Sequence, residues 1–219
     1  MHLAIHREGW PFIVLFAACN LFAFLFTAWL GCLLLPLTVW CVAFFRDPER
    51  ATPLAPGLVI CPADGRLLPI IAAVPPAELG LGDHPRPRLS VFMNVFNVHV
   101  NRNPVSGTVM ATAYRPGKFF NASFDKASEH NERMSIRLRP EGETDGSRDM
   151  AVVQIAGLVA RRIVCDLTRG EGVRRGARFG IIRFGSRVDV YLPADARVVA
   201  VPGTRVRAGE TVFAEFPQH

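Results

Sequence analysis

The sequence predicts a mainly β domain, barrel-sandwich-like with minor α content, that follows an N-terminal hydrophobic helical membrane anchor. Two observations lead to this fold class. Residues 11–45 contain no Asp, Glu, Lys, Arg or His. The chain after them alternates short apolar runs with intervals rich in Gly, Pro, Asp and Asn, which is typical of strands and turns. We therefore expect residues 1–45 to form the anchor, residues 46–57 a linker and residues 58–219 one β domain.

The uncharged stretch exceeds the ~20 apolar residues that cross a bilayer and is slightly short for two crossings. Gly31 and Pro36 lie near its middle. We expect two short helices or a re-entrant hairpin, roughly Phe12–Leu30 and Leu33–Phe45, and one long tilted helix is the alternative. The stretch is too long for a signal peptide, whose apolar part has about 7–15 residues, and no small-x-small cleavage site follows it. The anchor is therefore predicted to stay attached.

Charge indicates where the β domain lies. Arg46 and Arg50 follow the anchor directly and the rest of the chain is rich in arginine, which favours the cytoplasmic side of the cell membrane. The formal net charge is +6, and no recognition helix or basic-aromatic RNA motif accompanies it, so we expect anionic lipid as the partner and no nucleic acid. The five cysteines match neither a disulfide framework nor a metal site.

The β domain is expected to contain ten strands, joined by turns. Residues 159–167 alone have some helical periodicity. The predicted strands are Leu58–Cys61, Leu67–Val74, Leu89–Val100, Thr108–Ala113, Met134–Leu138, Met150–Ala156, Gly180–Arg183, Arg187–Leu192, Arg197–Val201 and Thr211–Phe216.

Gly185-Ser186 interrupts an apolar strand pattern close to the C-terminus. Glycine lacks the Cβ that would block a distorted backbone, and the serine hydroxyl can reach the preceding carbonyl. The dipeptide fits a self-cleaving bond, but it also fits an ordinary turn. A serine nucleophile needs a base, most often a histidine oriented by an aspartate.

One candidate is present for each of these roles. Asp64 lies in the turn Cys61-Pro62-Ala63-Asp64-Gly65, where Asp-Gly is also a common hairpin signal. His99 lies in the most β-prone stretch of the domain, and a two-residue repeat would place Asn97, His99 and Asn101 on one polar face. A lone histidine on a strand can equally be a structural residue.

Four motifs together make the chain resemble the phosphatidylserine decarboxylase proenzymes, in the short form found in some bacteria and archaea. They occur in the family's order and extend over nearly the whole region after the anchor. The matching residues are Pro62–Gly65, Phe96–Arg102, Asn131–Arg133 and Phe184–Arg187.

The resemblance implies self-processing. Ser186 would attack the carbonyl of Gly185, with His99 as base and Asp64 as its orienting group, to give a β chain of residues 1–185 and an α chain of residues 186–219. The former Ser186 would become a pyruvoyl cofactor. Through a Schiff base, this group would decarboxylate phosphatidylserine in the membrane to phosphatidylethanolamine. The two chains would stay together as a heterodimer, and a higher homo-oligomer is left open.

The chain departs from the long bacterial enzymes at two places. Their Leu-Gly-Ser-Thr is Phe184-Gly185-Ser186-Arg187 here, and their second histidine is replaced by Phe96. If that histidine donates the proton after decarboxylation, this chain needs another donor, for which His99 is the first candidate and His130 the second. The substrate-binding residues stay unknown, with Arg115, Lys118 and the arginines of residues 161–178 as candidates for the phosphate, although those arginines also suit a solvated face.

Two other functions stay open at this point. A pyruvoyl-dependent decarboxylase of a soluble amino acid would share the self-cleavage, but it would give no reason for the apolar N-terminus. A non-catalytic, membrane-tethered β-barrel adaptor would use Gly185-Ser186 only as a turn.

Overall fold

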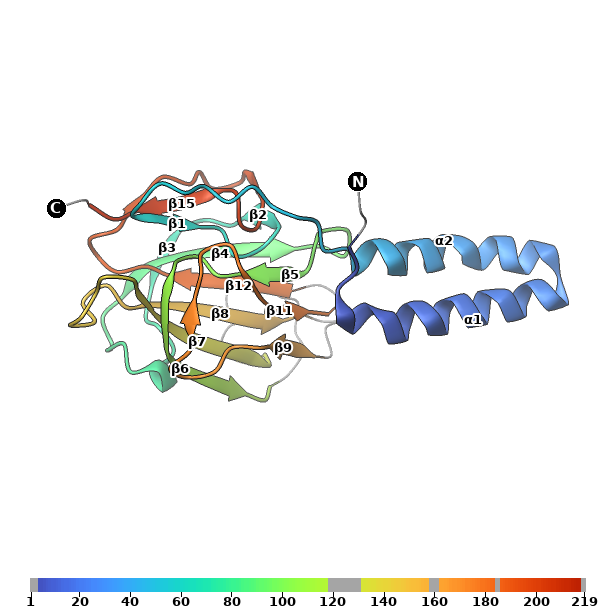
Figure 1. Cartoon of the computed structure of the whole chain (residues 1–219), viewed down its shortest axis with the longest axis horizontal. Helices are drawn as coiled ribbons and strands as arrows, with labels where there is room; N and C mark the ends of the chain where they lie inside the picture. Colours follow the sequence, from blue (N-terminus) through green and yellow to red (C-terminus); the bar gives the residue numbers. More distant parts are fainter. Residues whose placement is uncertain (1–3, 118–130, 158–161, 184–185, 218–219) are drawn as a thin grey trace. The chain divides into compact units, whose positions relative to one another are not determined.

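The computed structural model describes residues 4–117, 131–157, 162–183 and 186–217, which form two compact units (Figure 1). A helical unit contains residues 4–49 and the tripeptide Phe96–Val98. A β unit contains residues 50–95 and the described residues from His99 onward. The mainly β character and the N-terminal apolar helices confirm the predicted fold class.

The helical unit is an antiparallel pair of helices, α1 (Trp10–Phe26) and α2 (Ala28–Phe44), preceded by the 3-10 turn η1 (Arg7–Gly9). Thr27 separates the helices, with an extended backbone (φ −153°, ψ 137°). Two helices were expected, and the alternative of one long helix is wrong because Thr27 interrupts the helix. The break itself was expected near Gly31 and Pro36, but both residues lie inside α2. A Cβ on Gly31 would lie 2.3 Å from the ring of Phe24, so this glycine lets the helices approach closely.

The β unit contains one large sheet of nine strands in the order β10-β6-β7-β8-β12-β4-β2-β14, with β3 also paired to β4. The described strands form open sheets and no closed barrel, so the structure bears out the β-sandwich part of the predicted fold. Its strands are β2 (Gly65–Leu67), β3 (Ile71–Ala73), β4 (Arg86–Met93), β6 (Gly107–Arg115), β7 (Arg133–Pro140), β8 (Met150–Ala156), β10 (Gly172–Val173), β12 (Ser186–Tyr191) and β14 (Arg205–Val206).

Two three-stranded sheets complete the β unit. One has the order β1-β15-β13 and the other β5-β11-β9. Their strands are β1 (Leu58–Ile60), β5 (Val100–Arg102), β9 (Ile163–Cys165), β11 (Arg178–Ile182), β13 (Arg197–Val198) and β15 (Val212–Glu215). A second 3-10 turn, η2 (Ala77–Leu79), lies between β3 and β4 in sequence.

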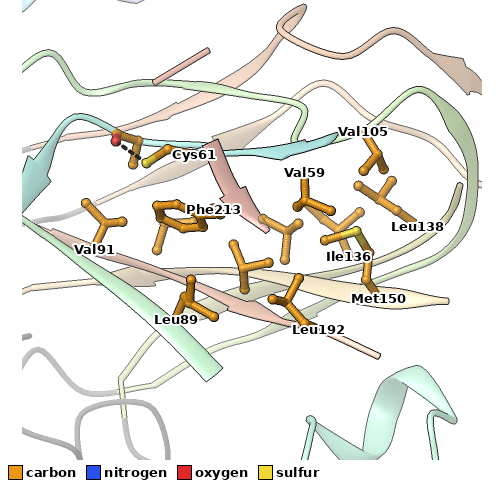
Figure 2. Close-up of a cluster of buried hydrophobic side chains, with 14 of the residues drawn as sticks. Val59, Cys61, Leu89, Val91, Val105, Ile136, Leu138, Met150, Leu192 and Phe213 are labelled. Carbon is orange, nitrogen blue, oxygen red and sulfur yellow. Dashed lines mark hydrogen bonds between the residues drawn. The ribbon is translucent and has the colours of Figure 1, made fainter. Parts of the chain in front are cut away.

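The main core forms where one face of the large sheet packs against residues of both small sheets (Figure 2). Val59 of β1 and Phe213 of β15 face Leu89 and Val91 of β4, and Phe179 of β11 belongs to the same cluster. These side chains are fully or almost fully buried. Alternation along each strand sends every second side chain into this core.

Two predicted elements differ from the structure. Leu89–Val100 was expected to be one strand, but β4 ends at Met93 and the chain turns before β5 begins in another sheet. Asparagines favour turns even within an apolar pattern, and Asn97 consequently does not share a strand face with His99 and Asn101. The helical periodicity of residues 159–167 was also misleading, since Ile163–Cys165 forms β9.

Candidate functional site

Ser186 is the first residue of β12, the strand that lies between β4 and β8 in the large sheet. Its Cα partners are Met93 and Ala156, and its side chain is fully buried. The hydroxyl donates to Sδ of Met93 at 3.3 Å. A thioether is a weak acceptor, so this contact holds the serine proton only weakly. Phe184 and Gly185 lie outside the described residues.

A small polar cluster adjoins Ser186 on the core face of the sheet. Asn101 of β5 points Nδ2 at Sδ of Met93, at 4.0 Å, and its Oδ1 accepts a hydrogen bond from Nε2 of Gln154 at 2.8 Å. Both amide side chains are fully buried. Met93 thus links the serine to a polar pair in which Asn101 comes from the β5-β11-β9 sheet and Gln154 from β8 of the large sheet.

His99 is fully buried and lies directly before β5. Its carbonyl oxygen accepts a hydrogen bond from the backbone N–H of Ile182, the last residue of β11, at 3.4 Å. This contact places the backbone of His99 beside the segment that leads into Gly185-Ser186. The second histidine candidate, His130, lies outside the described residues.

Asp64 lies in the turn between β1 and β2, with both carboxylate oxygens engaged. Oδ2 accepts from Nη2 of Arg50 at 2.7 Å, and Oδ1 accepts from the backbone N–H of Ala208 at 2.8 Å. The carbonyl of Pro62 in the same turn accepts from the backbone N–H of Arg102 at 2.9 Å. The structure therefore brings the Asp64 turn against β5, the strand that follows His99, and gives the carboxylate an arginine partner.

Arg50 was expected as part of the linker and as one of the arginines that follow the anchor, and not as a partner of Asp64. Its side chain is 8% exposed where it pairs with Asp64, and its Nη1 also lies 3.9 Å from Glu210. An arginine in a linker carries no sequence signal for such contacts, because neither Asp64 nor Glu210 is its neighbour in the chain.

The Asn131–Arg133 motif holds the strand end opposite Ser186. Nδ2 of Asn131 donates to the carbonyl of Ala156 at 2.7 Å, and the carbonyl of Glu132 accepts from the N–H of Ala156 at 2.9 Å. Since Ala156 is a Cα partner of Ser186, the motif fixes the backbone against which the serine lies.

The other face of β12 contains an ion pair that the sequence reading missed. Nε and Nη2 of Arg187 donate to the two carboxylate oxygens of Asp189 at 2.6 and 2.8 Å. Both side chains are fully buried. Nε of Arg88 on β4 lies 3.8 Å from the same carboxylate. The sequence could have indicated this pair, because two opposite charges at positions i and i+2 of a predicted strand lie on the same face.

The two thiols of the β unit, Cys61 and Cys165, are poorer candidates for a nucleophile than Ser186. Burial raises the pKa of the Cys165 thiol to about 11 and also raises that of Cys61. The Cys61 thiol donates to the carbonyl of Ala63 at 2.9 Å. Both groups therefore stay protonated near neutral pH, and Ser186 is the better candidate.

Comparisons with known proteins agree with this geometry. The phosphatidylserine decarboxylase family model matches residues 37–214. The chain is 56% identical over 215 residues to a phosphatidylserine decarboxylase proenzyme of Paramagnetospirillum magneticum, covering 97% of this chain and 87% of the relative. It is 52% identical over 212 residues to a protein of the same name from Rickettsia akari, covering 97% and 90%. The chain therefore belongs to the phosphatidylserine decarboxylase family.

Proposed function

We propose that this chain is a self-processing decarboxylase that converts phosphatidylserine to phosphatidylethanolamine at the cell membrane. The observation that carries the proposal is the buried Ser186 at the head of β12, in the family's cleavage motif, together with the hydrogen bond from Ile182 at the end of β11 to the carbonyl of His99. Family membership favours a decarboxylase over a non-catalytic adaptor. The apolar helices favour a lipid over a soluble amino acid as substrate.

Self-processing needs the Ser186 hydroxyl to lose its proton as Oγ attacks the carbonyl of Gly185. Because Met93 accepts that proton only weakly, little is lost when the proton moves to a stronger base, and we assign this role to His99. The amide becomes an ester, and elimination then leaves residues 1–185 with a terminal carboxylate. Addition of water and loss of ammonia at residue 186 complete the pyruvoyl group.

The surroundings of Ser186 fit a pyruvoyl group. Conversion replaces the backbone nitrogen by a ketone oxygen and removes Oγ, so the product needs no more space than serine. Met93 and Ala156 offer a neutral, apolar lining for its methyl group. A ketone in this position supplies the electron sink that decarboxylation of an amino acid requires and that no ordinary side chain provides.

The sheet pairings support a stable α–β heterodimer after cleavage. Within residues 186–217, β12 lies between β4 and β8, β14 pairs with β2, and β15 pairs with β1. Every partner strand belongs to the segment before residue 185. The short α chain would thus stay bound through these four strand pairings and the shared core.

Asp64 acts in this proposal by fixing the turn against β5, and so by orienting the segment that carries His99. The proton returned to the substrate carbon after carbon dioxide leaves would come from His99, with His130 as the second candidate.

Arg46 and Arg50 support a cytoplasmic position for the β unit.

Self-cleavage provides the test. The purified full-length chain, separated on a denaturing gel, should give two fragments, and mass spectrometry should find the smaller one to be residues 186–219 with a blocked first residue. The Ser186→Ala chain should stay whole. Carbon dioxide should be released from phosphatidylserine in vesicles and not from free serine. An uncut wild-type chain, or release from serine alone, would contradict the proposal.

A further inference from the structure

The two ends of the helical hairpin are tied together. The N–H of His6 donates to the carbonyl of Phe45 at 2.9 Å, and the N–H of Asp47 donates to the carbonyl of Ala4 at 2.8 Å. Both helices therefore start and finish at one base, while Thr27 forms the tip. The base has charged residues, and the described residues between Pro11 and Phe45 have none.

The hairpin has the properties of a membrane insertion. Arg7–Phe26 is a 20-residue helical stretch with a mean hydropathy of 2.0, long and apolar enough to cross a bilayer. Around the tip, the side chains of Leu25, Phe26 and Trp29 are 66–76% exposed. Lipid is the medium in which such a surface is stable.

One loop of the chain joins this hairpin at its base. The tripeptide Phe96–Val98 belongs to the helical unit, whereas the residues on either side of it belong to the β unit. Nη2 of Arg46 donates to the carbonyl of Phe96 at 2.8 Å, and Nη1 of the same arginine donates to the carbonyl of Ala43 at 2.6 Å. The Arg46 guanidinium therefore fastens the loop to the end of α2.

Phe96 is the exposed residue of this tripeptide. Its side chain is 70% exposed, in contrast to Val98, which is 4% exposed. Trp10, at the start of α1, is also 55% exposed. Aromatic side chains are favoured at the membrane–water boundary, and the base is where the apolar hairpin meets charged residues such as Arg7 and Arg46.

We propose that Phe96 inserts into the lipid at the membrane surface, next to the base of the hairpin, so that the segment leading into His99 is seated on the bilayer itself. The proposal extends the membrane function proposed above, and its first test does not depend on that function. Because His99 follows Phe96 by three residues, seating this loop would bring the catalytic segment to the depth of the phosphatidylserine headgroup.

Photocrosslinking tests the contact directly. A benzophenone-bearing phenylalanine analogue replaces Phe96 in the full-length chain, which is then bound to vesicles of phosphatidylcholine and phosphatidylglycerol and irradiated. We expect a covalent adduct of the chain with lipid. The same analogue at Leu54, a 90% exposed residue of the β unit, serves as the matched control and should give little adduct. No lipid adduct at position 96, equal adducts at both positions, or a covalent protein dimer in its place would overturn the inference.

A second experiment tests the consequence for turnover. Decarboxylation is measured per cleaved chain on phosphatidylserine in vesicles and on short-chain phosphatidylserine dissolved as monomers. The free energy of transferring a phenylalanine side chain from water into an apolar medium corresponds to a roughly ten- to hundredfold change in the equilibrium constant for insertion. We expect Phe96→Ser to lower the vesicle-to-monomer rate ratio about tenfold, Phe96→Leu to restore most of it, and Leu54→Ser to leave it unchanged.

The outcomes separate this inference from the proposed function. An unchanged ratio in Phe96→Ser, or a fall that Leu54→Ser reproduces, would overturn the seating of the loop and leave the decarboxylase intact. A wild-type chain that releases no carbon dioxide from either substrate would contradict the proposed function, and the crosslinking result would still decide where Phe96 lies.

Discussion

The two faces of β12 are equally buried and chemically opposite. On one face, which we call the reactive face, Val188 and Val190 join the main core and Ser186 is fully buried next to Met93. On the other face Arg187 and Asp189 form a fully buried ion pair, which we call the ion-pair face. A strand of six residues therefore places a neutral nucleophile directly before the arginine of a buried ion pair.

This difference separates reaction from support. A surrounding without charged groups lets the serine and its product change charge and bonding without a competing ion. The two charges, Arg187 and Asp189, are paired with each other along the same strand, and alternation prevents them from facing the serine. If this division is correct, changes to the reacting groups should slow processing, and changes on the ion-pair face should mainly lower stability.

The largest effect is expected from His99→Gln, which removes the proposed base. General-base catalysis contributes about 10²–10⁴-fold, so self-cleavage, followed as fragment formation over time on a denaturing gel, should slow by at least about 10²-fold. His84→Gln is the control, because the His84 side chain is 95% exposed. Cleavage of His99→Gln at the wild-type rate would remove His99 from the mechanism.

Next in size is Asp189→Asn, which leaves the buried Arg187 charge without its carboxylate. Removing one partner of a buried ion pair costs about 3–5 kcal/mol. We expect this loss in the free energy of unfolding, measured by urea titration in detergent micelles with Ser186→Ala as the common background to keep one chain. Asp195→Asn, at a carboxylate that is 39% exposed, should change little. A stable Asp189→Asn chain that fails to cleave when Ser186 is present would break the division between the faces.

A smaller effect should follow from Gln154→Leu, on the reactive face. The substitution removes the donor to Oδ1 of Asn101 and leaves a buried amide oxygen unsatisfied, at a cost of about 1–3 kcal/mol. The double variant with Asn101→Leu should lose less free energy of unfolding than the sum of the losses in the two single variants, because it removes both polar partners. Additive losses would show that the two amides are not coupled.

The sequence predicted the positions of most strands better than the turns and helix ends that connect the elements. Most strand positions followed from alternation, because local burial decides it. The turn after Met93 was missed, since Val95 and Val98 continue an apolar pattern through a segment that leaves the sheet. The end of α1 was also misplaced, because Thr27 breaks the helix without a glycine or proline.

Of the candidate site, the sequence supplied the motifs and the structure supplied their partners. Ser186, His99 and Asp64 could be selected from residue type and from the family pattern. Arg50 on Asp64 and Asn131 on the carbonyl of Ala156 could not, because these contacts join residues that are far apart in sequence. Gly65 is a similar case: a Cβ there would lie 2.1 Å from the carbonyl oxygen of Phe92, an approach that only the paired strands reveal.

The smallest effect is expected at the edge of the ion-pair face, where Glu78 of η2 pairs with Arg133 of β7. Nε and Nη2 of Arg133 donate to the two carboxylate oxygens at 2.9 and 3.0 Å, and the hydroxyl of Ser135 donates at 3.0 Å. Partial burial alone would raise the pKa of Glu78, but hydrogen bonding to the backbone and the charge of Arg133 outweigh it and lower this pKa.

A folded-state pKa below the unfolded value of about 4.3 means that the carboxylate stabilises the fold above that pH and loses this contribution as the pH falls through the folded pKa. Glu78→Gln should therefore cost about 1 kcal/mol near neutral pH, since the pair is partly exposed. The gap between the two urea titrations should close as the pH falls below the folded pKa. A gap that persists in acid would come from lost packing and not from charge, and the ion-pair face would then owe its stability at this edge to shape alone.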